Sequence, residues 1–228
     1  MKNRVLLILT LGVFVASMGT GQSVVGSKHD LSSGGPNATL RASNVDGVCV
    51  FCHTPHQATA ASAQDPLWNH DFPAATPTYG VYASNTLDAD MTSAEIGQAI
   101  GSASASMLCM SCHDGTVAVG ALYNDPNDPA GGEITPSNSA TMITGNPVLG
   151  NHTDDHPLNF TYNAALATTD GELNTPNSVD WVDAGNTVPL FGGTVQCASC
   201  HDPHDPTNAP FLVKDNTASA LCITCHIK

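Results

Sequence analysis

All cysteines of this 228-residue chain fall in one short pattern, Cys-x-x-Cys-His. The four copies begin at Cys49, Cys109, Cys197 and Cys222. Two sulfurs three residues apart on a helical turn can bond the two vinyl groups along one porphyrin edge, and the next residue then places an imidazole on the iron. The pattern therefore predicts four covalently attached haem c groups. The predicted thioether cysteines are Cys49, Cys52, Cys109, Cys112, Cys197, Cys200, Cys222 and Cys225, and the predicted proximal iron ligands are His53, His113, His201 and His226.

Three other uses of cysteine compete with haem attachment. Two Cys-x-x-Cys pairs can form a four-cysteine zinc site, one pair can form a redox disulfide, and eight cysteines in a secreted chain can form a disulfide framework. None of these sites requires a histidine directly after the second cysteine. The four histidines therefore favour haem.

Six further histidines can supply the second axial ligand of each iron: His29, His56, His70, His152, His156 and His204. His56 follows His53 by three residues, and His204 follows His201 by three. Because the two axial ligands of one iron lie on opposite faces of the porphyrin, such a short span cannot supply both. His56 and His204, if they are ligands, must therefore bind a neighbouring haem. Solvent-facing or propionate-bonding roles are the alternative for these two residues.

The remaining distal ligands are less clear from the residues alone. His29 precedes Asp30, and His156 follows Asp154 and Asp155, so acidic neighbours could raise the basicity of both imidazoles. His70 and His152 are weaker candidates. The residues leave the choice between His152 and His156 close to even.

The N-terminus is typical of a secretory signal peptide. Lys2 and Arg4 precede an apolar run over residues 5–16, and small or polar residues follow. We predict a signal peptide over residues 1–21, with the cleavage site within 17–23, and a mature chain beginning at about residue 22. The run is too short to span a bilayer comfortably, and no other stretch approaches the length needed, so we expect no transmembrane segment.

Composition and charge narrow the class of protein. The formal net charge is −14, which becomes −16 once Lys2 and Arg4 are removed with the leader. Such a charge argues against nucleic acid as a partner and against docking on anionic lipid. Only 5% of residues are aromatic and 11% charged, and glycine and proline number 20 and 15. The chain therefore has little bulky apolar material for a side-chain core.

The motifs alternate between two types. Residues 49–56 read CVFCHTPH and residues 197–204 read CASCHDPH, whereas residues 108–113 read LCMSCH and 221–226 read LCITCH. This order indicates a duplicated two-haem unit. We predict a first unit at about 45–123, an insert at about 124–192 and a second unit at about 193–228, all within one tetrahaem domain.

We expect a mostly irregular fold with short helices at the haem motifs and a core packed by the haems themselves. The clearest expected helices cover residues 92–113 and 217–226, and short strands are possible at 117–121 and 188–195. The stretch at about 115–192 is rich in Asn, Asp, Thr, Pro and Gly, so we expect mostly irregular backbone there.

Several stretches besides the motifs carry a resemblance to a known family. They are residues 28–32, 66–69, 114–119, 155–157 and 190–196. Together with the motifs, they resemble the tetrahaem extracellular cytochromes of metal-reducing bacteria, most closely the outer-surface cytochrome E type that polymerises into conductive filaments. The resemblance implies bis-histidine haems, with His29, His56, His156 and His204 at the distal positions. It also implies that one distal histidine comes from the adjacent subunit, and we expect His29 on the N-terminal arm to be that donor.

Three functions can be weighed on these observations. An electron carrier suits six-coordinate irons, which exchange electrons but have no open position for a reactant. A multihaem nitrite or sulfite reductase would need a five-coordinate haem and cations to hold an anion, which four Lys/Arg in the mature chain make improbable. A purely structural filament would not need four haems. We therefore expect a secreted electron carrier rather than an enzyme. Its expected partners are copies of itself in a filament, other redox proteins and extracellular electron acceptors, with the periplasm as the alternative location.

Overall fold

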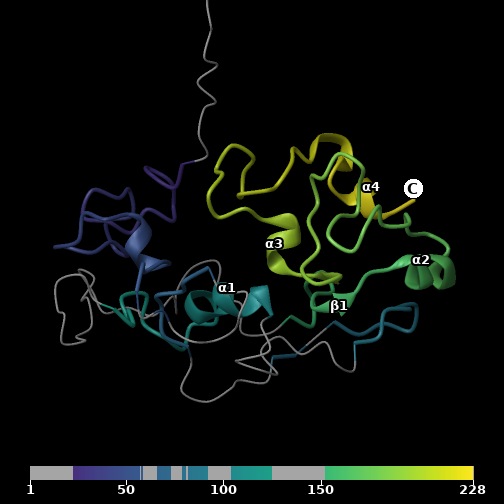
Figure 1. Ribbon diagram of the computed structural model, residues 1–228, viewed down its shortest axis with the longest axis horizontal. Coiled ribbons are helices and arrows are strands. Elements are labelled where there is room, and N and C mark those ends of the chain that lie inside the picture. Colours follow the sequence, from purple (N-terminus) through teal and green to yellow (C-terminus); the bar gives the residue numbers. More distant parts are fainter. Residues whose placement is uncertain are drawn as a thin grey trace, which may run out of the picture.

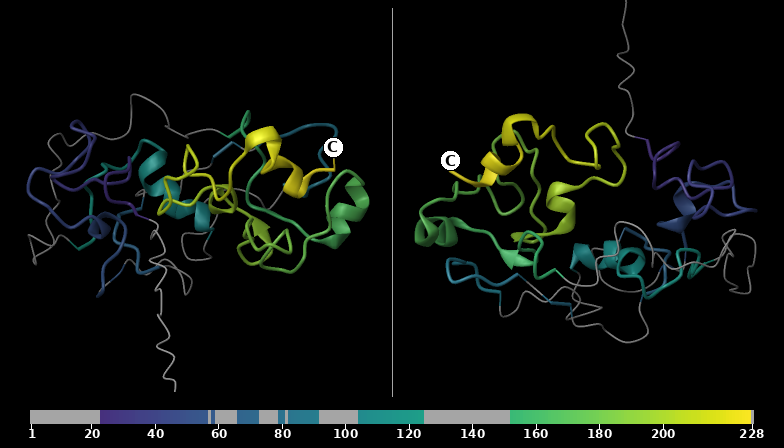
Figure 2. Two further views of the ribbon diagram at one scale, coloured as in Figure 1. Left: turned by 90° about the horizontal axis from the view of Figure 1, so that it is seen from above. Right: turned by 180° about the vertical axis from the view of Figure 1, so that it is seen from behind.

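The computed structural model describes residues 23–56, 58, 66–72, 79–80, 82–91, 104–124 and 152–227. The predicted signal peptide therefore lies outside the described residues. In Figure 1 residues 23–56, in purple and blue, lie at one end of the molecule, and most of residues 152–227, in green and yellow, lie towards the other. Helix α1 lies between them and next to α3, and Figure 2 shows the same arrangement from two further sides. No helix in these described ranges is long and apolar enough to cross a membrane.

Short helices carry all four motifs, as predicted. They are the 3-10 helix η1 (Cys49–Phe51), α1 (Ala105–His113), α3 (Cys197–Cys200) and α4 (Cys222–Cys225). The backbone N–H of His53, His201 and His226 each donates to the carbonyl of the first cysteine of its motif, at 2.8–3.0 Å. This single helical turn is what brings the two sulfurs and the histidine together.

The two expected helices are shorter than predicted. Of residues 92–113, the described part begins at Ser104 and contains α1, while 92–103 lie outside the described residues. The helix expected over 217–226 is broken, because Ala218 and Ser219 adopt positive φ angles of 54° and 61°. Only the 3-10 helix η2 (Thr217–Ser219) and α4 remain of it.

The expected strands were largely wrong. Residues 117–121 hold a turn, in which the Ala121 N–H donates to the Ala118 carbonyl, and among the described residues they join no strand beyond a single bridge at Ala118. Of residues 188–195, only β2 (Thr194–Val195) is a strand, and it pairs antiparallel with β1 (Phe160–Thr161). Strands need a partner to satisfy their backbone groups, and nothing in the local sequence identified residues 160–161 as that partner.

The stretch at about 115–192 is mostly irregular in its described part, as expected, with two short elements towards its C-terminal end. It contains β1 and α2 (Ala164–Asp170), whose N-cap Asn163 accepts a hydrogen bond from the Leu166 N–H and whose C-cap Gly171 has φ 74°. The largest hydrophobic cluster among the described residues also lies mostly there: Phe160, Tyr162, Val182, Val188, Leu190 and Val195. Asparagine and aspartate turns interrupt these apolar residues in the sequence, so they show no helical or strand period.

The N-terminal segment is fixed by a buried carboxylate. Asp30 is 3% exposed and accepts hydrogen bonds from the Gly26 N–H, the Ser32 N–H and the Ser32 hydroxyl. Burial alone would raise the pKa of Asp30, but these hydrogen bonds lower it overall. The loop closes tightly at Gly35, where an added Cβ would lie 2.0 Å from the Asp30 carbonyl oxygen. This loop holds His29 in place.

We predict that Gly35→Ala destabilises the N-terminal loop while Gly34→Ala does not. At Gly35 the added methyl meets backbone, which cannot rotate away, so the free energy of unfolding should fall by roughly 1–3 kcal/mol. At Gly34 the nearest atom to an added Cβ is the Ser32 hydroxyl at 3.9 Å, an ordinary contact. Denaturant titration of the two haem-loaded variants measures the difference, and equal stability would contradict the described loop.

Candidate haem-binding site

Three of the four motif histidines face a histidine from a distant part of the chain. The ring centroids are 6.1 Å apart for His29 and His113, 6.1 Å for His53 and His204, and 6.3 Å for His156 and His226. With metal–nitrogen bonds of about 2.0–2.1 Å and ring centres about 1.1 Å behind Nε2, two imidazoles across one metal ion have centroids roughly 6.3 Å apart. The three pairs therefore fit the spacing of two axial ligands on one iron.

The orientation of several of these rings is fixed through Nδ1. The Nδ1 atoms of His53, His201 and His156 lie 2.6, 2.9 and 2.8 Å from the backbone carbonyl oxygens of Pro66, Pro210 and Pro157. A carbonyl only accepts, so Nδ1 carries the proton and Nε2 keeps a free lone pair. This tautomer is the one that binds a metal through Nε2.

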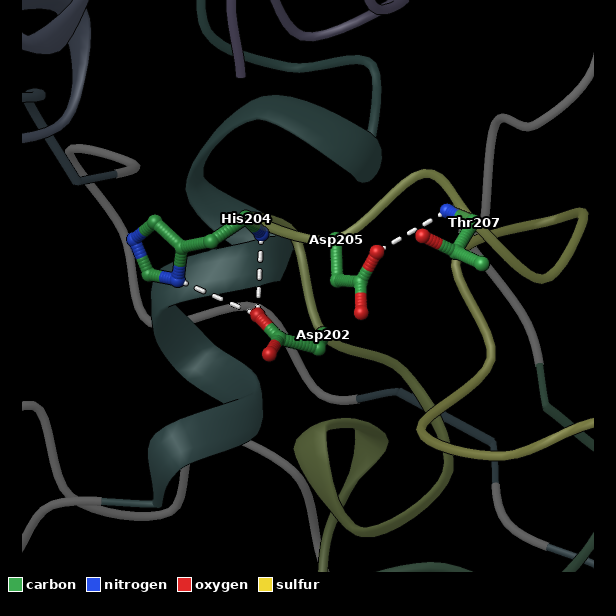
Figure 3. A network of polar contacts seen from close by, with 4 residues as sticks. All are labelled: Asp202, His204, Asp205 and Thr207. Atoms are coloured by element: carbon green, nitrogen blue, oxygen red, sulfur yellow. Dashed lines mark hydrogen bonds and ion pairs between the residues drawn. The ribbon is translucent and has the colours of Figure 1, made fainter. Parts of the chain in front are cut away.

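His204 is held by a carboxylate instead of a carbonyl. Its Nδ1 lies 3.1 Å from Asp202 Oδ1, which also accepts the His204 backbone N–H at 2.9 Å. Figure 3 shows both contacts, together with the turn in which Asp205 accepts from the Thr207 N–H. Both carboxylates stabilise the loop that presents His204.

His29 is half-buried beside its neighbours. Phe211 lies against it, with ring centroids 4.5 Å apart. Burial lowers the pKa of His29, and the nearby His113 lowers it further. A lowered pKa favours the neutral imidazole, which is the form that binds a metal.

His70 and His152, the two weaker candidates, do not present an Nε2 that is open to the surface. His70 is fully buried, and its Nε2 lies 3.0 Å from the Ala118 carbonyl oxygen. His152 is 3% exposed, its Nδ1 lies 3.0 Å from Asp155 Oδ2, and its Nε2 is buried against the protein. Since a porphyrin needs open space in front of the ligand atom, these positions do not suit an axial ligand.

His56 and His201 are the two candidate ligands without a facing histidine in the described part of the chain. Both residues are exposed. The backbone around His56 is well fixed, because its carbonyl accepts from the Thr54 hydroxyl at 2.8 Å and from Asn124 Nδ2 at 3.1 Å. One motif histidine and one distal candidate thus have no facing histidine among the described residues, and both are exposed, as His156 and His204 also are.

The same backbone arrangement recurs at the first and third motifs. His53 and His201 each form a bridge with the residue that lies two after the proline contacting Nδ1, Trp68 and Leu212. Between proline and bridge, Leu67 and Phe211 have φ angles of 56° and 61°. The carbonyls of these two residues accept from the Thr54 and Asp202 N–H groups. A comparison of the segments 66–69 and 210–213 would have been needed to find this arrangement in the sequence.

The cysteines are arranged for attachment and not for cross-linking. All eight are free thiols, and each is exposed or half-buried. Among the described residues, no three His, Cys, Asp or Glu side chains converge as a zinc site would require. The Cys109 and Cys197 thiols interact with each other, which raises the pKa of Cys109 and lowers that of Cys197. The second and third motifs therefore bring their first sulfurs together.

Comparison with known proteins agrees with this site. Residues 189–228, which hold the third and fourth motifs, match the family described as "Doubled CXXCH motif". No curated protein matches the chain. The doubled motif indicates a multihaem c-type cytochrome, which binds haem c covalently and serves electron transfer.

We predict that the haem-loaded protein carries four haems. A pyridine haemochrome assay against protein mass should give four haems per chain, and changing Cys222 and Cys225 together to Ser should give three, because each motif attaches its own haem. Bound zinc, or a haem count that the double substitution leaves unchanged, would contradict the assignment.

Proposed function

We propose that this protein transfers electrons through four bis-histidine haem c groups, as the repeating subunit of an extracellular filament. The observation that carries the proposal is the set of three histidine pairs at 6.1–6.3 Å. Haem c supplies a one-electron carrier at each pair, and two imidazole ligands leave no open position for a substrate. The chain's part is to hold the carriers close together and to fix their ligands.

Short sequence steps connect the proposed sites. His204 lies three residues after His201, yet its ring faces His53. One tripeptide step therefore links the site of the third motif to that of the first. A second link runs through Trp68, whose ring lies 6.3 Å from His53 and whose Nε1 donates to Ser111 in α1 at 3.3 Å. The tripeptide step, the ring contact and this hydrogen bond thus connect the proposed sites of motifs one, two and three.

The filament follows from the two histidines left over. His56 would bind the iron attached to His201 of a neighbouring copy. Both residues are exposed, and neither has a facing histidine in the described part of the chain, so each could supply the ligand that the other lacks. The step from His53 to His56 would then repeat, between copies, the step from His201 to His204 within a copy. Leu67 and Tyr123, both about half exposed, lie in the segments hydrogen-bonded around His56 and offer apolar contact there.

This proposal changes the expected donor between subunits. The sequence suggested His29, but its ring is half-buried and lies 6.1 Å from His113 of the same chain. His29 is therefore assigned within the chain, and His56 takes the role between copies. The N-terminal signal, the acidic charge and extracellular acceptors complete the proposal, with export followed by assembly outside the cell.

A second candidate function rests on the same exposed histidine. If His201 keeps an open position opposite it in the assembled protein, the haem there could bind a reactant. The surroundings argue against an anionic substrate, because Asp202 and Asp205 lie close by and the chain is acidic. Carbon monoxide binding by reduced native filaments would favour this candidate, and its absence favours the electron carrier.

We predict distinct electron paramagnetic resonance signals from the three pairs. Nearly parallel imidazole planes give a rhombic low-spin ferric spectrum, and nearly perpendicular planes give a signal with a large maximal g value. The His53–His204 pair, at 10°, should give the rhombic signal, and the other two, at 89° and 76°, the second kind. His204→Ala should remove the rhombic signal and make one haem high-spin.

Added imidazole provides the control for that variant. It should occupy the position left by His204 and return the haem to low spin while the haem count stays at four. A rhombic signal that survives His204→Ala, with no high-spin haem, would show that His53 has a different partner.

We predict that His56→Ala abolishes filaments without loss of haem. The variant should retain four haems and its fold, because His56 is exposed, but negative-stain microscopy should show no fibres. His29→Ala is the matched comparison, since it removes a ligand within the chain and leaves the His56 face intact. Fibres from His56→Ala, or their loss only in His29→Ala, would reverse the two assignments.

A further inference from the structure

One buried amide joins the second and third haem motifs. Gln196, the N-cap of α3, is 1% exposed, and every polar atom of its side chain has a partner. Its Oε1 accepts from the Ser104 hydroxyl at 2.7 Å and from the Ser106 hydroxyl at 2.6 Å. The Ser106 N–H also points at Oε1, at 3.3 Å. The amide oxygen therefore caps the beginning of α1.

The other end of the amide holds a third segment. Gln196 Nε2 donates to Asn159 Oδ1 at 2.7 Å and to Thr194 Oγ1 at 2.8 Å. Asn159 lies three residues after His156, the proposed partner of His226. One side chain thus contacts the segments that present three of the four proposed haem sites.

The contact continues directly to the sulfurs. The Ser106 hydroxyl, which donates to Gln196, also accepts from the Cys197 N–H at 3.0 Å. Ser106 lies one helical turn before Cys109 in α1, and its hydroxyl is hydrogen-bonded to the backbone of Cys197 in α3. The two sulfurs that anchor neighbouring haems are therefore held at a spacing that this network defines.

We propose that Gln196 is a positioning residue for electron transfer, because it fixes the separation between the haems attached to Cys109 and Cys197. This inference rests on the proposed function, since it concerns the haems of that same carrier. The cluster of Ser104, Ser106 and Gln196 can fix this separation, because its buried hydrogen bonds are directional and fully satisfied. They allow only one arrangement of α1 against α3. Apolar packing alone would allow the helices to slide.

The test uses the full haem-loaded protein and the variant Gln196→Met, which keeps the volume but removes every hydrogen bond of the amide. The bisignate Soret circular dichroism that arises from coupled neighbouring haems should lose about half its amplitude or more. The fastest inter-haem phase after flash photoreduction should slow several-fold, because electron tunnelling falls off exponentially with the distance between the haem edges. Haem count should remain four.

Two further variants make the result decisive. Ser106→Ala removes the link between Gln196 and Cys197 from the α1 side and should change both signals in the same direction, which decides the case if Gln196→Met does not load haem. Asn174→Ala is the matched control. It removes an amide that donates to the carbonyls of Ile223 and Thr224 in α4, at 3.1 Å each, without touching α1 or α3. It should lower stability but leave the fastest phase unchanged.

The outcomes separate this inference from the proposed function. If Gln196→Met and Ser106→Ala load four haems and keep the native Soret signal and rate, the positioning role is wrong while the carrier stands. An equal change in Asn174→Ala would show a general loss of stability and would also overturn it. A native protein without inter-haem transfer would instead overturn the proposed function.

Discussion

An iron with two imidazole ligands must be approached from both faces of a flat ring, and this constraint governs the whole arrangement proposed here. The second ligand has to come from a segment far from the motif, because three residues cannot pass around a porphyrin. In the proposed arrangement, long-range pairs meet this requirement: His29 with His113, His53 with His204 and His156 with His226. Loops that carry these residues must be held firmly without helices or sheets to support them.

Hydrogen bonds between side chains and backbone provide much of that support. Helices of four residues, such as α3 and α4, are too short to be stable by themselves. Asp30 fixes the loop before His29, Asp202 fixes the turn before His204, and Asn174 holds the carbonyls of α4. This explains why a chain with few aromatic residues is so rich in Ser, Thr, Asn and Asp. These residues position irregular backbone, which a larger apolar core would not do alone.

The covalent attachment pattern could be predicted from the sequence because its spacing is local. The proposed choice of His156 over His152 could not, because it rests on whether Nε2 faces open space or buried protein, and both residues have acidic neighbours. Strand β1 and helix α2 were missed because their apolar partners, such as Phe160 and Val195, are far apart in the chain. Gln196 was missed for the same reason. A lone glutamine before a motif gives no sign that serines about 90 positions earlier will bind it.

The three proposed ligand pairs also determine how the chain is closed on itself. The segment 29–113 overlaps 53–204, and 53–204 overlaps 156–226, so no loop can open independently of the next. With haems covalently attached at one end of each pair and coordinated at the other, the loops are interlaced in the way that crossed disulfides are. A protease that cut one exposed turn would leave the fragments joined through iron. Resistance to proteolysis outside the cell would then depend on the topology of the chain as well as on the packing of each element.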